Sequence, residues 1–302
     1  MNKDLISGFD IETTDIQKVF ARAAQLKKQK RQPVLSGKII GLIFQKPSVR
    51  TRVSFEVAAE HLGARCIYLA PEDVKLGQRE PIKDVARVLS RYLDAIVART
   101  FKHTHVEELA QAADITVING LSDLYHPCQA LADIFTVYER NPKLDKVKIA
   151  FVGDGNNVLH SLLAITAKTG MTLSAATPKG YEPDRNIFKA AQNIAKKTGA
   201  NLTHTYDIQA AVSGADFVYT DVWTSMGQEK ERKKRMRDFK KFQVNSRLLK
   251  SAGKGCLVMH CMPVHRGEEI SAEVMDSKRS IVYEQAENRL HVQKAVMALL
   301  LK

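Results

Sequence analysis

Short apolar runs alternate with helix-patterned segments along most of this chain. The run GKIIGLIF (37–44) is typical of a strand. The segment that follows it carries Phe55, Ala58, Ala59 and Leu62 at the i, i+3, i+4, i+7 spacing of one helix face. Strands that alternate with helices in this way predict parallel sheets covered by helices on both faces.

The alternation forms two series, and it breaks near residue 140. Further strands are predicted at CIYLA, DAIVART, ITVIN, VKIAFVG, MTLSAA, NLTHT, DFVYTDV and CLVMH. We therefore expect an α/β protein of two domains, each a parallel sheet with helices on both faces. The expected domains are residues 1–140 and 141–285, and the expected amphipathic helix at 286–302 packs back on the first domain.

Composition narrows the class of protein. The chain has 302 residues, and its apolar stretches are far shorter than the ~20 residues that span a bilayer. Its first residues contain early acids and no apolar signal core, and its four cysteines are scattered without a CxxC pair, which together predict a cytoplasmic protein with reduced thiols. The net charge of +13 favours anionic ligands. The basic run Lys230 to Lys241 favours a solvated helix face, and nucleic-acid binding remains the alternative.

The first unusual polar cluster, SVRTR, follows the strand at 37–44. Ligands of open α/β sheets bind outside the carboxyl ends of the strands, so this loop is a candidate site. A helix that begins near Arg50 offers unpaired backbone N–H groups, and Ser48 and Thr51 add hydroxyl groups. This combination predicts a phosphate-binding cradle, although it lacks the GxxxxGK[ST] pattern of nucleotide P-loops.

The segment HPCQALAD supplies a second cluster. His126 lies just before the helix that Pro127 opens, and Gln129 lies in its first turn. An imidazole and a carboxamide there can hydrogen-bond the carbonyl and amide of one small ligand. Arg99, at the end of DAIVART, adds a cation for the same carbonyl oxygen.

Two later loops contain residues that suggest other functions. GDGNNV fits only part of the G-x-G-x-x-G dinucleotide fingerprint, because position 158 is Val. An NAD(P)-dependent dehydrogenase is therefore disfavoured. In HCMPVHRGEEI, the residues Cys261, His260 and Glu269 suggest a cysteine nucleophile or a zinc site. Both are disfavoured: no second cysteine lies at ligand spacing, so we expect no metal, and we expect no covalent step at the cysteine.

The loop DVWTSMG follows a predicted strand. An acid at a strand end, Asp221, can pair with an α-ammonium group, while Ser225 and the backbone of Met226 can hold a carboxylate. An Asn such as Asn157 can bind both groups of a zwitterion.

Together these motifs resemble the aspartate/ornithine carbamoyltransferase family, in the family's order and over nearly the whole chain. The family's first motif usually reads S-T-R-T-R, where this chain has Val49. D-x-x-x-S-M-G is typical of ornithine-specific members, as is H-C-L-P, where this chain has Met262. KLGQREP resembles the family's swinging loop, which closes a neighbouring subunit's site, with Lys75 where ornithine enzymes often carry glutamine.

The resemblance implies transfer of a carbamoyl group from carbamoyl phosphate to the δ-amine of L-ornithine, without metal or organic cofactor, in a homotrimer or a multiple of it. Putrescine or another amine is the alternative acceptor. The implied catalytic residues are Cys261, Arg99 and His126. The implied carbamoyl-phosphate residues are Ser48, Val49, Arg50, Thr51, Lys75, Arg99, His126, Gln129, Cys261, Met262 and Arg289. The implied ornithine residues are Asn157, Asp221, Ser225 and Met226.

Overall fold

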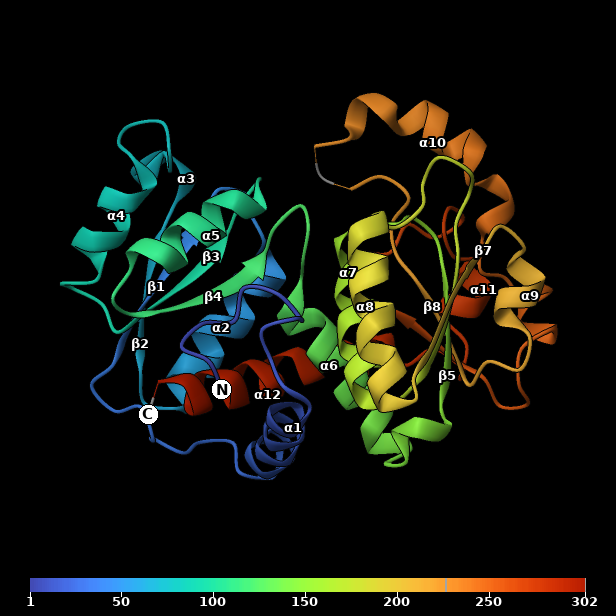
Figure 1. The fold of residues 1–302 in the computed structure, drawn as a ribbon, viewed down its shortest axis with the longest axis horizontal. Coiled ribbons are helices and arrows are strands. Elements are labelled where there is room, and N and C mark those ends of the chain that lie inside the picture. Colours follow the sequence, from blue (N-terminus) through green and yellow to red (C-terminus); the bar gives the residue numbers. More distant parts are fainter. Residues whose placement is uncertain (226, 302) are drawn as a thin grey trace. The chain divides into compact units, whose positions relative to one another are not determined.

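The structure is a computed structural model that describes residues 1–225 and 227–301. It contains two compact units, each built around its own parallel sheet (Figure 1). Unit 1 comprises Met1–Phe135 and Asn288–Lys302, and unit 2 comprises Thr136–Glu287. The sequence pattern placed the divisions after residues 140 and 285. The predicted fold class, two parallel-sheet domains flanked by helices, is confirmed.

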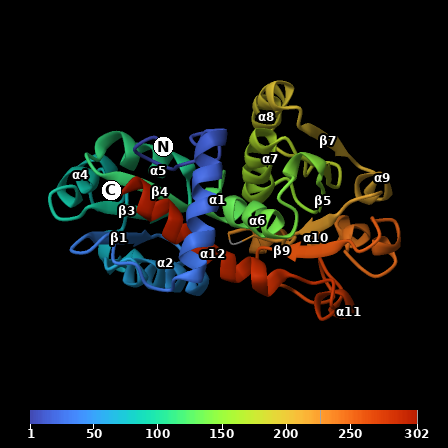
Figure 2. The same cartoon turned by 90° about the horizontal axis from the view of Figure 1, so that it is seen from below.

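Unit 1 contains a four-stranded sheet in the order β2-β1-β3-β4. Its strands are β1 (Ile39–Phe44), β2 (Arg65–Leu69), β3 (Ala95–Arg99) and β4 (Thr116–Leu121). Its covering helices are α2 (Val49–His61), α4 (Ile82–Leu89) and α5 (His103–Ala112). Because parallel crossovers are right-handed, the change of direction at β1 puts α2 on one face and α4 with α5 on the other (Figure 2).

The C-terminal helix α12 (Val282–Leu300) lies against the N-terminal helix α1 (Thr13–Lys28). The ammonium group of Lys294 is fully buried and donates to the carbonyl oxygens of Leu26 and Lys30 at 2.8 and 3.0 Å. Leu26 lies in the last turn of α1, where carbonyls have no partner within the helix, and Lys30 follows two residues after its end. Both ends of the chain therefore belong to unit 1 (Figure 1).

Unit 2 contains a five-stranded sheet in the order β7-β6-β5-β8-β9. Its strands are β5 (Lys148–Val152), β6 (Thr172–Ala176), β7 (Asn201–Thr205), β8 (Phe217–Thr220) and β9 (Leu257–His260). Its crossover helices are α7 (Asn157–Thr169), α8 (Arg185–Thr198) and α9 (Ile208–Val212). The same handedness rule puts α7 and α8 on one face and α9 on the other, as Figure 1 shows.

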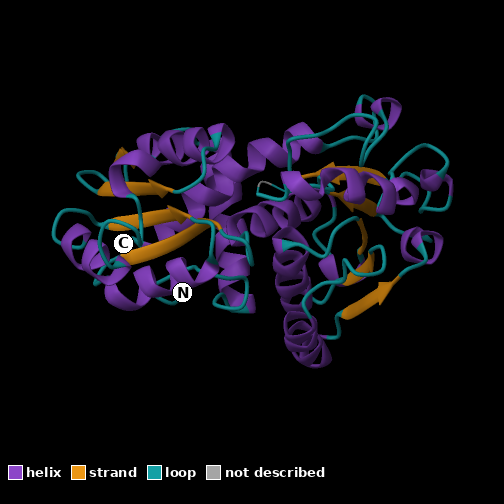
Figure 3. Ribbon diagram, turned by 90° about the horizontal axis from the view of Figure 1, so that it is seen from above, coloured by secondary structure: helices purple, strands orange, loops and turns teal. Residues whose placement is uncertain are grey.

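The remaining helices lie in connections (Figure 3). They are α3 (Pro71–Val74), α6 (Pro127–Arg140), α10 (Arg232–Asp238) and α11 (Ala272–Met275), with short 3-10 turns at 144–146, 229–231, 240–242 and 248–250. The basic run thus contains a helix, but the expectation of a solvated face is wrong for Arg235, which is buried. Among the residues that the structure describes, no helix is long and apolar enough to cross a bilayer.

Each sheet has one point at which the direction of strand addition reverses. In unit 1 it lies between β1 and β3, where Phe44 is paired with Arg99. In unit 2 it lies between β5 and β8, where Val152 is paired with Thr220. Loops diverge beyond such switch points and leave a crevice in which ligands bind. The fold therefore marks the loops after these four strands as candidate sites.

Candidate active site

The loop after β1 forms the start of α2, as the SVRTR motif predicts. Ser48 has an extended backbone and occupies the N-cap position, where its hydroxyl accepts the backbone N–H of Thr51 at 3.3 Å. The first turn of α2 contains no acidic side chain. The positive end of the helix dipole is therefore offered to an external anion.

The Thr51 hydroxyl is the meeting point of two buried arginines. Arg99, at the end of β3, donates to its oxygen at 3.3 Å, and Arg289 of α12 donates at 2.9 Å. Burial, together with the charges of Arg289 and Arg50, lowers the pKa of Arg99 to about 10. Like charges gathered away from water are costly, so an anion that joins them is strongly favoured.

Neutral hydrogen-bonding groups accompany these cations. His126 precedes α6 and is buried, and that burial together with the charges of Arg289 and Arg99 holds its pKa well below the ordinary value. The imidazole is therefore neutral and can donate to a carbonyl without adding charge. The Gln129 amide nitrogen donates to Asp133 at 2.8 Å, which leaves its buried Oε1 without a hydrogen bond from any described residue. That oxygen is an acceptor suited to an amide N–H of a ligand.

Three other predicted residues of unit 1 are exposed. Val49 is 78% exposed, so its side chain has little role in the cradle and its contribution is its backbone N–H. Arg50 is exposed in the first turn of α2, where its guanidinium can reach a bound anion from the solvent side. Lys75 is exposed at the end of α3 with φ of +42°. No hydrogen bond or ion pair joins Lys75 to the cradle among the described residues.

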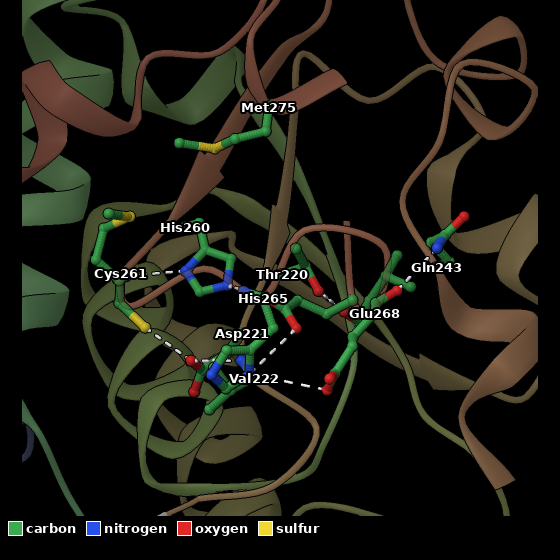
Figure 4. A network of polar contacts seen from close by, with 12 residues as sticks. Thr220, Asp221, Val222, Gln243, His260, Cys261, His265, Glu268 and Met275 are labelled. Carbon is green, nitrogen blue, oxygen red and sulfur yellow. Dashed lines mark hydrogen bonds and ion pairs between the residues drawn. The ribbon is translucent and has the colours of Figure 1, made fainter. Parts of the chain in front are cut away.

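In unit 2 the loops after β5 and β8 meet at Asp221. This carboxylate is buried, and the amide nitrogen of Asn156 donates to its Oδ2 at 2.7 Å. The thiol of Cys261, after β9, donates to its Oδ1 at 2.9 Å (Figure 4). The backbone N–H of Val222 also donates to Oδ1 at 2.8 Å. Donors that satisfy a carboxylate in this way fix its orientation and stabilise its charge.

Sequence reasoning missed Asn156. It caps α7, because its Oδ1 accepts the backbone N–H groups of Val158 and Leu159, while its Nδ2 holds Asp221. An Asn immediately before a helical pattern is the available signal for the cap, but the contact with Asp221 crosses 65 positions of sequence. The predicted Asn157 occupies the first helical position and is partly buried. Ser225 lies in the turn before α10, and Met226 lies outside the described residues.

The His260 ring fixes the loop that carries Cys261. Its Nδ1 accepts the backbone N–H of Met262 at 2.8 Å, so its Nε2 carries the proton and donates to Glu269 at 3.1 Å (Figure 4). Met262 has φ of +62°, an unusual conformation for a side chain other than glycine, and the bond from its N–H stabilises it. Ligand-type atoms of Asp221, His260 and Cys261 lie within 4.8 Å of one another. Since both ring nitrogens of His260 are engaged, the imidazole has no lone pair left for a metal.

A buried ion pair ties the loop after β8 to the loop after β5. Arg235 of α10 donates to Asp154 at 2.8 Å and to the carbonyl oxygen of Trp223 at 3.0 Å, and its guanidinium lies over the ring of Tyr181. Burial raises the pKa of Asp154 to about 6 against the attraction of Arg235. Gly155 lets the loop after β5 pack closely against the backbone of Glu182, because a Cβ at this position would lie 2.3 Å from the carbonyl carbon of Glu182. The close approach of the two backbones thus explains this glycine, and dinucleotide binding is not needed to explain it.

The predicted residues fall into two sets, one in each unit. Unit 1 brings together Ser48, Thr51, Arg99, His126, Gln129 and Arg289, with Val49 and Arg50 at the exposed edge of the same helix start. Unit 2 brings together Asp221 and Cys261, with Met262 next to Cys261 in the loop after β9 and Asn157 at the first position of α7. Cys261 and Met262, which the resemblance assigns to the donor, thus belong to the same unit as the residues assigned to the acceptor.

Comparisons with known proteins match both units. Residues 3–139 match the family model described as aspartate/ornithine carbamoyltransferase, carbamoyl-P binding domain. Residues 145–300 match the model described as aspartate/ornithine carbamoyltransferase, Asp/Orn binding domain. The chain belongs to the aspartate/ornithine carbamoyltransferase family. Within this family the SVRTR cradle lies in the carbamoyl-phosphate domain, and the Asp221 cluster lies in the amino-acid domain.

Individual members of the family cover the whole chain. An ornithine carbamoyltransferase of Listeria monocytogenes is 52% identical over 304 residues, which are 99% of this chain and 96% of that protein. One from Halalkalibacterium halodurans is 51% identical over 303 residues, which are 99% and 95% of the two chains. The solved structure of ornithine carbamoyltransferase from Pyrococcus furiosus has a TM-score of 0.96 at 49% identity, covering 99% of this chain and 96% of that one.

Proposed function

We propose that this protein transfers the carbamoyl group of carbamoyl phosphate to the δ-amine of L-ornithine, which gives L-citrulline and phosphate. The observation that carries the proposal is the pair of buried arginines that meet at the Thr51 hydroxyl beside a neutral imidazole. A dianionic phosphoryl group and an adjacent carbonyl oxygen suit this set. Relatives named ornithine carbamoyltransferase, about half identical over the full chain, support ornithine as the acceptor.

Carbamoyl phosphate binds with its phosphoryl oxygens on the Ser48 and Thr51 region, the helix N–H groups and the Arg50 guanidinium. Its carbonyl oxygen receives hydrogen bonds from Arg99, Thr51 and His126. Its amide lies near Oε1 of Gln129. These donors stabilise the negative charge that grows on the carbonyl oxygen as the carbon is attacked, which is the role of an oxyanion hole.

Ornithine binds through its α-ammonium group at Asp221 and through its carboxylate at Asn157, Ser225 and the backbone of Met226. Its δ-amine has an unperturbed pKa near ~10.4 and attacks only when neutral. Cys261 lines this position. The nitrogen then forms a bond to the carbonyl carbon, the bond from that carbon to the phosphate oxygen breaks, and phosphate leaves with the electron pair and the displaced proton. Orientation of both substrates supplies much of the rate.

The reaction belongs to arginine metabolism, and we propose that it proceeds in the direction of synthesis. A relative whose structure is titled anabolic ornithine carbamoyltransferase, from Campylobacter jejuni, supports this direction at 36% identity. We also propose a homotrimer or a multiple of it as the active form. Exposure of Lys75 on its loop is compatible with a role toward a neighbouring copy. Light scattering of the purified protein measures the oligomer.

Purified protein incubated with carbamoyl phosphate and single amines tests the reaction. Ornithine, putrescine and Nα-acetylornithine form the panel, and the carbamoylated product and released phosphate are both measured. We expect equal amounts of citrulline and phosphate with ornithine, and a specificity constant at least about 100-fold lower with either alternative, because each lacks a charge that Asp221 or the carboxylate donors bind. Faster reaction with putrescine would reject ornithine as the acceptor.

A further inference from the structure

The turn after Cys261 contains a second group of ligand-type side chains, which we name the turn cluster: His265, Glu268 and Glu269. Their ligand atoms all lie within 4.8 Å of one another. Nδ1 of His265 lies 3.8 Å from Oε2 of Glu268 and 3.9 Å from Oε2 of Glu269. The three side chains come from the motif HRGEE: Glu269 contacts the His260 ring described above, and His265 and Glu268 have no role in the proposed reaction. Figure 4 shows His265 and Glu268, whose ion pair is drawn as a dashed line.

Glu269 is the unusual member of the turn cluster. Its side chain is fully buried, and its Oε1 accepts from the His260 ring and from the backbone N–H of His265 at 2.6 Å. Its Oε2 is buried too, yet it accepts no hydrogen bond from any residue in the described part of the chain. A buried carboxylate oxygen without a hydrogen bond is costly, so this atom favours a ligand that the protein does not itself supply.

The backbone holds the turn cluster in place. Gln243 donates from its amide nitrogen to the carbonyl oxygens of Gly267 and Glu268 at 2.9 and 3.0 Å. The turn closes on itself, because the N–H of Glu268 donates to the carbonyl of His265 at 2.9 Å. Arg232 of α10 forms an ion pair with Oε1 of Glu268, which directs Oε2 of that carboxylate toward His265. Oxygens fixed in this way are prepared for a small cation.

We propose that the turn cluster binds a divalent cation of the zinc class. One imidazole nitrogen and two carboxylate oxygens form a three-ligand set that zinc accepts, with water as a fourth ligand. Tetrahedral ligands at about 2.1 Å from zinc lie roughly 3.4 Å apart, and the ligand atoms of the turn cluster lie within 4.8 Å of one another, so side-chain shifts of about 1 Å or less close the site. Magnesium and calcium are disfavoured because they require six or more oxygen ligands, and the turn cluster offers an imidazole nitrogen.

The cation takes no part in the reaction proposed above. The reacting atoms require no metal, and the turn cluster is linked to the ring that supports the active-site loop by the Glu269–His260 hydrogen bond. The cation would satisfy Glu269 and thereby fix the His260 ring that supports Met262. Its expected effect is on the stability of this loop, so binding is measurable without any assay of carbamoyl transfer.

Cation binding is tested on untagged full-length protein that has been freed of metal by chelation and dialysis. Zn²⁺ and Co²⁺ are titrated by calorimetry and by visible absorption. We expect one equivalent per chain and a tetrahedral Co²⁺ spectrum without the near-ultraviolet band of a cobalt–thiolate bond. Loss of a supporting residue weakens metal sites about 10–100-fold, so loss of the ligand in His265→Ala should weaken affinity by about 100-fold or more.

Two matched variants separate the possibilities. Cys261→Ser should leave Zn²⁺ affinity within about twofold, whereas a large loss together with a thiolate band in the wild type would move the cation to Cys261 and overturn the proposal. Glu268→Gln keeps the shape of a partly exposed ligand and should weaken binding at least about tenfold, which covers the case in which His265→Ala does not fold. Absence of stoichiometric uptake by the wild type would also overturn the proposal.

Discussion

Replacing Arg235 by methionine removes the ion-pair partner of Asp154 while keeping much of the side-chain volume. Both side chains of this pair are about nine-tenths buried, and their atoms lie 2.8 Å apart. Breaking one partner of a buried pair typically costs about 3–5 kcal/mol, because the other charge is left uncompensated. We therefore expect Arg235→Met to reduce the free energy of unfolding of unit 2 by about 4 kcal/mol at pH 7.

The loss of unfolding free energy caused by Arg235→Met should depend on pH, and the pKa of Asp154 gives the sign of this dependence. The pKa of Asp154 is about 6 in the folded protein and 3.8 in its unperturbed state, so the folded protein binds the proton more tightly and this group adds stability as the pH falls. Without Arg235 the folded pKa rises further. Between pH 7 and pH 5 the free energy of unfolding of the variant then rises over about two pH units, and that of the wild type over about one. The difference between the two proteins therefore shrinks by about 1.4 kcal/mol.

Trp223 provides the assay. It is the only tryptophan in the sequence, it belongs to unit 2, and its carbonyl accepts a hydrogen bond from Arg235. Urea unfolding followed by its fluorescence at about pH 5, 6, 7 and 8, at one protein concentration, gives the free energy for both proteins. The double variant Arg235→Met/Asp154→Asn carries no titrating group here and should lose the extra pH dependence. A deficit that is the same at every pH, or an undiminished slope in the double variant, would refute the reasoning.

The remaining predictions concern the two ligand sets. Arg50→Ala should raise the KM for carbamoyl phosphate at least about tenfold by loss of one charge-assisted hydrogen bond, with the KM for ornithine unchanged in initial-rate measurements; equal effects on both would contradict the assignment. Asp221→Asn should do the converse, and an unchanged ornithine KM would remove this carboxylate from the acceptor site. Because the pKa of His126 is lowered in the folded protein, wild-type stability should fall as the pH drops below about 6.5, and His126→Gln should lessen that slope in circular-dichroism unfolding; an identical slope would show that His126 is not held neutral.

The fold was predictable because buried parallel strands are apolar along their whole length. Ile39–Phe44 is an example, since five of its six residues are buried. The helix face at Phe55, Ala58 and Ala59 is buried in α2 as its spacing predicts. The last helix begins at Val282, before the predicted residue 286, because its first turn buries Val282 and the polar Gln285 and exposes the aromatic Tyr283, which departs from an apolar helix pattern.

The site was predictable where its residues follow strands, and less so where contacts cross the sequence. Thr51 and Arg99 were accessible to sequence reasoning because each adjoins the end of a strand at the switch point of its sheet. Asn156 and Arg235 were not, because the partners that give them a role, Asp221 and Asp154, lie 65 and 81 positions away. A basic run predicts solvent exposure on average, and only the folded chain shows which arginine of the run is buried.

The central claim is that one protein joins the carbon of carbamoyl phosphate to the δ-nitrogen of ornithine. Carbamoyl phosphate labelled with ¹³C at its carbonyl, mixed with the purified protein and ornithine, tests this claim in a single NMR spectrum. We predict that the labelled carbon appears in the ureido group of citrulline, in one-to-one proportion to the phosphate released. Phosphate release without labelled citrulline, or release at the same rate when ornithine is omitted, would contradict the account.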